Sequence, residues 1–293
     1  MIELIRALGM FCEAPSEEHV RIAKILGFSQ TPSRDLYEGI FCRELPPYAS
    51  EYIDCGANSD GEGLERISGF WRALQRDVPN EPDHLSGLLG LVAYLEELQG
   101  SEKEPARALL IRRSRSALLW EHLLPWLPMY LDKVESIGDD TVYGDWARLL
   151  TEALVNEYRS LGPLESLPIH LTTSSGLPDP RDRGAKLFVS SLFCPNKSGF
   201  VLLFDDLSEL ATELGIAPSN KDPRMALEDL LRLAPKETLG ALAKLASETH
   251  SRLVSKWGSL GEITAYWEAR NEESAILLEQ LVQDLEVATD LPS

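Results

Sequence analysis

The stretch that decides the fold is DHLSGLLGLVAYLEEL, residues 83–98, in which apolar side chains recur every three or four positions. That spacing places them on one side of an α-helix, whereas a strand would show a two-residue repeat. Asp83 precedes the first apolar residue and belongs to the residue types that cap helices. The pattern therefore predicts a helix that begins directly after Asp83 and has a buried apolar stripe, formed by Leu85, Leu88, Leu89, Val92, Leu95 and Leu98.

Helical spacing of apolar residues recurs along most of the chain. In the first half it covers 17–26, 64–75, 105–120 and 146–161, and in the second half 206–214, 224–233, 236–257 and 263–287. Glycine or proline follows several of these stretches, as expected at helix ends. The fold class is therefore predicted to be all-α, a helical bundle followed by a mainly helical extension.

Two stretches depart from this pattern. Between residues 36 and 54, Gly39, Pro46 and Pro47 alternate with aromatic residues, which predicts a loop packed on helices. Farther on, two short apolar runs flank Pro195–Gly199, which fits either a short hairpin or two helix ends.

A domain boundary is predicted where the helical pattern stops. Residues 163–185 are rich in proline and keep no lasting periodicity, so they form a linker or an ordered loop. This divides the chain into a helical domain at 1–162, the segment 163–185, and a C-terminal extension at 186–293.

Composition narrows the class of protein. Lys and Arg number 28 against 47 Asp and Glu, and a net charge of −19 opposes binding to nucleic acid or to an anionic membrane surface. No signal peptide and no apolar run long enough to span a bilayer is visible, and the four cysteines are widely spaced. A cytoplasmic protein without a zinc site, a disulfide framework or direct membrane insertion is expected.

The densest group of functional side chains is Glu81-Pro82-Asp83-His84. Its E-x-x-H spacing occurs in di-iron helical bundles, but such a site requires a second copy and the sequence has none. There is also no G-x-S-x-G elbow and no phosphate-binding P-loop. We therefore predict no catalytic residues and no metal ligands, and the simplest interpretation of Asp83 is a helix cap. Four arginines, Arg107, Arg112, Arg113 and Arg115, predict a solvated basic helix face or, alternatively, a surface that contacts an anion or nucleotide.

Three separated segments, in order, resemble motifs of the TorD/DmsD/NarJ family of redox-enzyme maturation chaperones, which serve molybdoenzymes. They are LPPYASEY at 45–52, EPDHL at 81–85 and EHLLPW at 121–126. The resemblance covers roughly residues 1–160 and implies an all-helical TorD-like fold. The resemblance implies no role for the C-terminal part of the chain.

The resemblance also implies a function without turnover. Such a chaperone binds the N-terminal twin-arginine leader of the catalytic subunit of a molybdopterin-dependent oxidoreductase, prevents premature export and assists cofactor insertion. It needs no cofactor, although some members bind guanine nucleotide weakly, and it is expected as a monomer or a domain-exchanged dimer. The alternative is a helical scaffold or adaptor that binds no leader.

The same resemblance implies a set of leader-binding residues. Two arginines and an apolar stretch call for carboxylates beside an aromatic groove, and Glu81, Asp83 and Glu121 are the candidate carboxylates. The complete predicted set is Tyr48, Tyr52, Trp71, Glu81, Pro82, Asp83, His84, Glu121, His122, Pro125 and Trp126.

Overall fold

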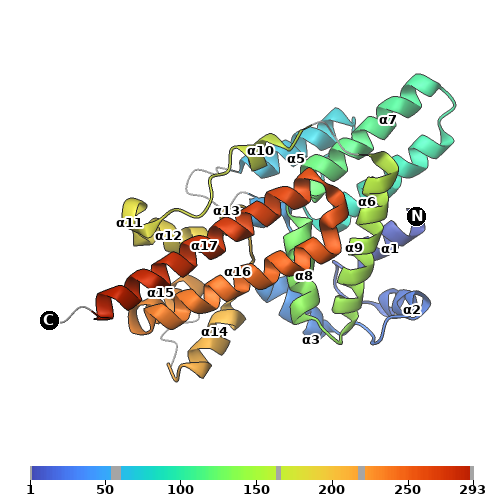
Figure 1. The fold of residues 1–293 in the computed structure, drawn as a ribbon. Helices are drawn as coiled ribbons and strands as arrows, with labels where there is room; N and C mark the ends of the chain where they lie inside the picture. Colours follow the sequence, from blue (N-terminus) through green and yellow to red (C-terminus); the bar gives the residue numbers. More distant parts are fainter. Residues whose placement is uncertain (1, 54–60, 163–165, 217–221, 291–293) are drawn as a thin grey trace. The chain divides into compact units, whose positions relative to one another are not determined.

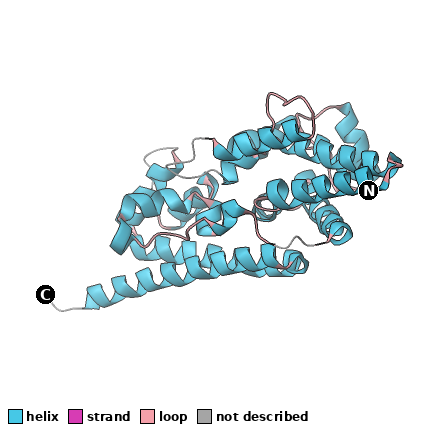
Figure 2. Ribbon diagram, turned by 90° about the horizontal axis from the view of Figure 1, so that it is seen from above, coloured by secondary structure: helices cyan, strands magenta, loops and turns pink. Residues whose placement is uncertain are grey.

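The computed structural model describes residues 2–53, 61–162, 166–216 and 222–290. Within these ranges the regular structure is helical and no strand occurs (Figures 1 and 2). Among the described residues, the one β-type contact is an isolated antiparallel bridge between Tyr48 and His84. The prediction of an all-α fold is confirmed.

The described helices fall into two compact units. The first contains residues 1–172 and the short segment 259–263. Its helices are α1 (Ile2–Met10), α2 (Glu17–Leu26), α3 (Arg34–Tyr37), η1 (Glu38–Glu44), α4 (Ala49–Ile53), α5 (Glu62–Ala73), α6 (Leu85–Ser101), α7 (Pro105–Ala117), η2 (Leu118–Leu123), α8 (Leu127–Ile137), α9 (Val142–Leu161) and α10 (Ile169–Thr172).

The core of the first unit forms around α6, the helix predicted from residues 83–98. Every residue of its predicted stripe up to Leu95 is buried. Helix α1 lies along α6 so closely that a Cβ atom at Gly9 would meet the Leu89 Cβ atom at 3.3 Å. Helix α9 also contacts α1, because the Trp146 indole of α9 donates to the Leu8 carbonyl at 2.8 Å. The side-chain spacing therefore determines which faces of these helices meet.

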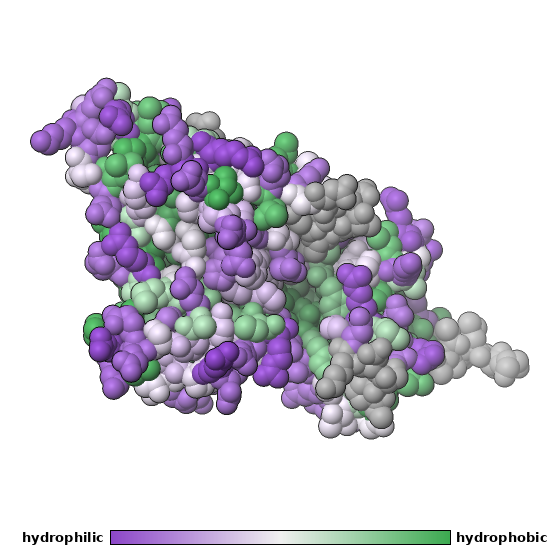
Figure 3. Space-filling model, turned by 180° about the vertical axis from the view of Figure 1, so that it is seen from behind, coloured by the Kyte–Doolittle hydropathy of each residue, from purple (hydrophilic) through white to green (hydrophobic). Residues whose placement is uncertain are grey.

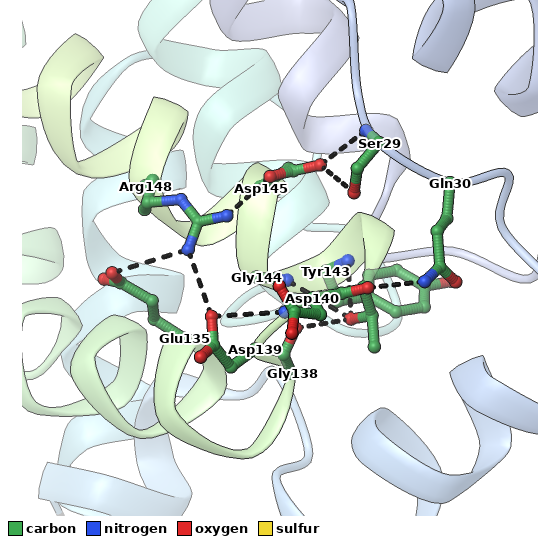
Figure 4. Close-up of polar contacts among 11 residues, drawn as sticks. Ser29, Gln30, Glu135, Gly138, Asp139, Asp140, Tyr143, Gly144, Asp145 and Arg148 are labelled. Carbon is green, nitrogen blue, oxygen red and sulfur yellow. Dashed lines mark hydrogen bonds and ion pairs between the residues drawn. The ribbon is translucent and has the colours of Figure 1, made fainter.

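A polar network ties the chain after α2 to the start of α9 (Figure 4). The Asp145 carboxylate accepts from both the backbone N–H and the hydroxyl of Ser29 at 2.6 Å, and Arg148 donates to Asp145 at 2.5 Å. The Thr141 hydroxyl caps α9 by accepting from the Tyr143 N–H at 3.2 Å. The Thr141 bond satisfies a backbone donor that the N-terminus of α9 leaves free.

The prediction of a loop over 36–54 is wrong for its first part. Helix α3 continues directly into η1, which has π-helical hydrogen bonding, and a break comes only at Pro46 and Pro47. A glycine within a helix costs about 1 kcal/mol. Here Gly39 is outweighed by the burial of Ile40 and Phe41, whose ring packs edge-on against Trp146.

The predicted basic face of α7 is only partly solvated. Arg115 is 7% exposed and pairs with Glu157 of α9. Arg112 is exposed and donates to the carbonyls of Ser160 and Leu161 at the C-terminus of α9. Such a contact satisfies carbonyls that a helix end leaves free. The solvated-face prediction is therefore wrong for Arg115, and Arg112 has a structural partner.

The second unit contains residues 173–258 and 264–293. Its helices are α11 (Pro180–Arg183), α12 (Ala185–Leu192), α13 (Pro195–Ser198), α14 (Phe204–Glu213), α15 (Pro223–Leu233), α16 (Pro235–Trp257) and the greater part of α17 (Glu262–Asp290), with η3 (Gly258–Leu260) at the boundary between the units. The predicted mainly helical extension is confirmed. The boundary falls inside the segment 163–185, whose described part contains the short helices α10 and α11.

The hairpin alternative around Pro195–Gly199 is wrong. The apolar run before it forms α12, in which Phe188, Val189 and Leu192 are buried at helical spacing. The turn itself is the one-turn helix α13, which ends at Gly199 with a φ of 82°. A Cβ atom there would meet the Asn271 backbone nitrogen at 2.8 Å, so close packing on α17 requires glycine. Two short apolar runs alone do not distinguish these structures.

The surface agrees with the strongly charged composition. Hydrophilic side chains cover most of the face shown in Figure 3, with apolar side chains in small groups between them. No helix in the described part of the chain has both the length and the apolar composition needed to cross a bilayer.

Candidate functional site

The motif at residues 81–84 forms a hinge loop that connects the chain after α5 to the start of α6. Its backbone pairs with the segment before α4. The Ala49 N–H donates to the Asp83 carbonyl at 3.1 Å, and the Leu85 N–H donates to the Pro47 carbonyl at 2.8 Å. Two of the three motifs found in the sequence therefore lie side by side.

The Asp83 side chain strengthens this pairing. It is 3% exposed, and its Oδ2 atom accepts from the Ser50 N–H at 3.1 Å and from the Ser50 hydroxyl at 2.6 Å. Asp83 thus supports the start of α4, and the prediction that it caps the following helix α6 is wrong. That cap is His84, whose Nδ1 atom accepts from the Ser86 N–H at 3.3 Å.

His84 lies between the hinge loop and the aromatic segment before α4. Its ring packs edge-on against the Tyr48 ring, with 4.8 Å between centroids. Burial lowers the pKa of His84, and the nearby Glu81 carboxylate partly opposes this shift. Because Nδ1 accepts the cap hydrogen bond, the neutral form with its proton on Nε2 fits the geometry.

Glu81 is the exposed carboxylate of the hinge loop. Its Oε1 atom accepts from the half-buried Tyr48 hydroxyl at 2.9 Å. Partial burial, together with this hydrogen bond to a carboxylate, raises the pKa of Tyr48 to about 12. The phenol therefore stays protonated at neutral pH and holds the carboxylate in one place, at the surface.

Two neighbouring residues on α5 connect the hinge loop to the third motif. The half-buried Trp71 donates its indole N–H to the Pro82 carbonyl at 3.0 Å. The preceding residue, Phe70, packs against the ring of His122 on η2, with 4.9 Å between the ring centroids. Burial, helped by the positive charge of Arg66, lowers the pKa of His122 to about 4. His122 is therefore neutral at physiological pH.

The remaining aromatic residues of the predicted set lie in the core. Tyr52 and Trp126 are 6% and 1% exposed, and their rings stack with 5.3 Å between centroids. The Tyr52 hydroxyl donates to the Pro46 carbonyl at 2.9 Å, and the Trp126 indole donates to the His122 carbonyl at 2.8 Å. Both polar groups are satisfied inside the protein. These two residues shape the segments that carry the site and expose almost no surface.

The eleven predicted residues thus divide by accessibility. Tyr48, Trp71, Glu81 and His84 reach the surface around the hinge loop, whereas Pro82, Asp83, His122 and Pro125 are buried beneath it or beside it. Glu121 is exposed on η2. Together with the stacked core pair, this accounts for the whole set.

Sequence reasoning missed several residues that complete the arrangement. Ser50 binds Asp83, and it is the serine of the motif at 45–52, so the motif itself contained the signal. Phe70 and Arg66, which approach His122, carry no comparable signal because helical spacing marks Phe70 only as a core residue. In the described ranges, no three histidine, cysteine or acidic side chains gather in a way that would hold a metal ion.

Replacing Asp83 by alanine is expected to lower the free energy of unfolding by about 1–3 kcal/mol, because it leaves two partly buried donors of Ser50 without their acceptor. Glu81→Gln is the matched control, since it changes an exposed carboxylate in the same loop and is expected to shift stability by less than about 0.5 kcal/mol. Urea denaturation measures both values. Equal stability of the two variants would show that the Asp83 carboxylate is not structural.

Comparison with known proteins indicates a class of protein. The part of the chain that contains the hinge loop is similar to the maturation chaperones of molybdoenzymes. Specifically, residues 34–132 match the family model of the nitrate reductase delta subunit, which represents the NarJ/TorD-type chaperones. The resemblance inferred from the three motifs is thereby confirmed. The chain matches no curated protein and no solved structure.

The range that matches the family model includes the whole candidate site. It covers about a third of the chain and contains all eleven predicted site residues, from Tyr48 to Trp126. Residues 133–293 lie outside it. The family match and the candidate site therefore concern the same part of the first unit.

Proposed function

We propose that the protein is a cytoplasmic chaperone that binds the N-terminal leader of the catalytic subunit of a molybdopterin-dependent oxidoreductase. It holds the subunit back from export while the cofactor is inserted and the enzyme assembles. The observation that carries this proposal is the hinge loop at 81–84, paired with the Tyr48 segment inside the range that matches a maturation-chaperone family. The protein's own contribution is binding, without turnover.

The accessible chemistry around the hinge loop suits a twin-arginine leader. Glu81 presents a carboxylate at the surface, which favours a guanidinium group. The half-buried rings of Tyr48 and Trp71 offer flat faces on which arginine or an apolar side chain can pack. Asp83 has its carboxylate engaged with Ser50, so its role in this proposal is to position the loop.

Calorimetric titration of the purified chain with leaders of molybdoenzyme catalytic subunits, encoded beside its gene, tests this function. Micromolar or tighter binding of one leader is expected. Glu81→Lys should weaken it at least tenfold, because a like charge then faces the leader arginines. Glu152→Lys is the matched control: it makes the same charge change at an exposed position on α9 and should leave the affinity unchanged.

A second leader, with both arginines replaced by glutamine, makes the test specific. If Glu81 contacts the arginines, the charge reversal should have little further effect on this weakened leader, since coupled changes are not additive. Additive losses would contradict the contact. If no leader binds to the folded, unmodified chain, the scaffold or adaptor alternative is favoured.

A further inference from the structure

Residues Ser166–Thr172 belong to the first unit, and Figure 1 shows their short helix α10 beside α5. The Trp120 indole of η2 donates to the Ser166 carbonyl at 2.7 Å. Leu171 is 1% exposed and Pro168 is also buried. The His170 ring is near enough to Arg66 and His122 that both help burial to lower its pKa. The segment is therefore docked on this surface.

The covered surface adjoins the candidate site. His122 lies two residues beyond Trp120 on η2, and its ring contacts Phe70 of α5. The next residue of α5 is Trp71, which binds the hinge loop through the Pro82 carbonyl. One short stretch of α5 thus contacts the hinge loop on one side and the surface beneath Ser166–Thr172 on another.

The docked segment has the composition of an apolar peptide. Its sequence, SLPIHLT, contains no acidic residue, lysine or arginine in a chain of which 26% is charged. A leader peptide likewise combines its arginines with an apolar stretch. The surface beside Trp120 therefore already holds a segment of the kind that the proposed ligand would present.

The docking of this segment is incomplete. Its only regular element is α10, a single turn of four residues. Ile169 is 73% exposed, and the buried His170 Nε2 atom has no hydrogen-bond partner among the described residues. A buried polar atom without a partner opposes docking. These features are expected of a segment that leaves its surface readily.

We propose that Ser166–Thr172 is an intramolecular cover, seated on α5 and η2 over the surface that receives the apolar stretch of the client leader, and that leader binding displaces it. This inference rests on the proposed leader-binding function. The leader arginines would bind at Glu81, and the apolar stretch would extend along α5 to the place of Leu171. The cover lowers the apparent affinity, because part of the binding free energy is spent on its release.

Hydrogen exchange on the full, unmodified chain tests the displacement directly. The N–H groups of Leu171 and Thr172 both donate to the Pro168 carbonyl, at 3.0 and 3.2 Å. Addition of a binding leader is expected to accelerate exchange at these two amides. Unchanged or slower exchange, with the leader bound, would contradict the proposal that the leader displaces this segment, and would not affect the proposed function.

A pair of variants provides an independent measurement. Leu171→Ser removes the buried anchor of the cover and is expected to tighten leader binding at least tenfold in calorimetric titration. Ile169→Ser is the matched control, because it makes a similar change at an exposed position of the same segment and should leave the affinity unchanged. Equal leader affinities of the two variants would contradict the proposal that this segment covers the binding surface. If neither variant nor the unmodified chain binds any leader, the proposed function itself fails.

Discussion

Glu157→Ala is expected to lower the free energy of unfolding by about 3–5 kcal/mol, because it leaves the Arg115 guanidinium buried without its main partner. Glu157 is 1% and Arg115 7% exposed. The pair is bidentate: Arg115 Nε donates to Glu157 Oε1, and Nη2 donates to Oε2 at 2.6 Å. Gln99 and Glu96 of α6 approach the same guanidinium at 3.3 and 3.6 Å. One buried charge thus joins α6, α7 and α9.

An exposed pair in the same unit provides the control. Arg6 and Glu97 are 2.9 Å apart, but their side chains are 45% and 63% exposed. Glu97→Ala should therefore cost no more than about 1 kcal/mol in urea denaturation at neutral pH. The double variant Arg115→Met, Glu157→Leu should recover most of the lost stability, because it removes both buried charges together. Similar losses for the two single variants would contradict the role assigned to burial.

This ion pair illustrates what the sequence alone can predict. Helical spacing predicts that 105–120 is helical, because that signal lies within a few turns of chain. It does not predict that Arg115 faces inward, since its partner Glu157 is 42 residues away. Arginines are usually solvated, and their long side chains can cover apolar neighbours. The interpretation of Arg115 as part of a solvated face followed from that general behaviour.

The candidate site shows the same division between local and distant information. The three motifs were visible in the sequence, and their family resemblance is confirmed over 34–132. The particular role of Asp83 was not visible. A local rule makes it the cap of the next helix, but Ser50, 33 residues earlier, takes its carboxylate, and His84 caps α6 instead.

The contacts of residues 166–172 likewise depend on residues that are distant in the chain. Their proline content and lack of periodicity indicate a linker or an ordered loop, and the pattern does not distinguish the two. The choice is made by the Trp120 hydrogen bond to Ser166 and by the burial of Leu171. Each partner surface comes from helices more than 40 residues earlier in the chain, which no local pattern specifies.

Lowering the pH from 6.5 to about 4 is expected to destabilise the protein by roughly 3 kcal/mol through His122 alone. In the unfolded chain a histidine has a pKa near 6.5. In the folded protein burial lowers the pKa of His122 to about 4 and that of His170 to about 3, and the Arg66 charge acts in the same direction on both. Between these values the unfolded chain binds more protons, so stability is complete above pH 6.5 and falls as the pH falls.

His122→Phe should remove this contribution while keeping an aromatic ring against Phe70. Urea denaturation at pH 7 and at pH 4.5 gives the decrease in the free energy of unfolding between these two pH values. This decrease is expected to be about 2–3 kcal/mol smaller for the variant than for the unmodified protein. Asp145 stays ionised over this interval: burial opposes its charge, but hydrogen bonds from Ser29 and Arg148 hold its pKa below the ordinary value. An identical loss in the His122 variant would show that burial and the Arg66 charge do not keep this ring neutral in the folded state.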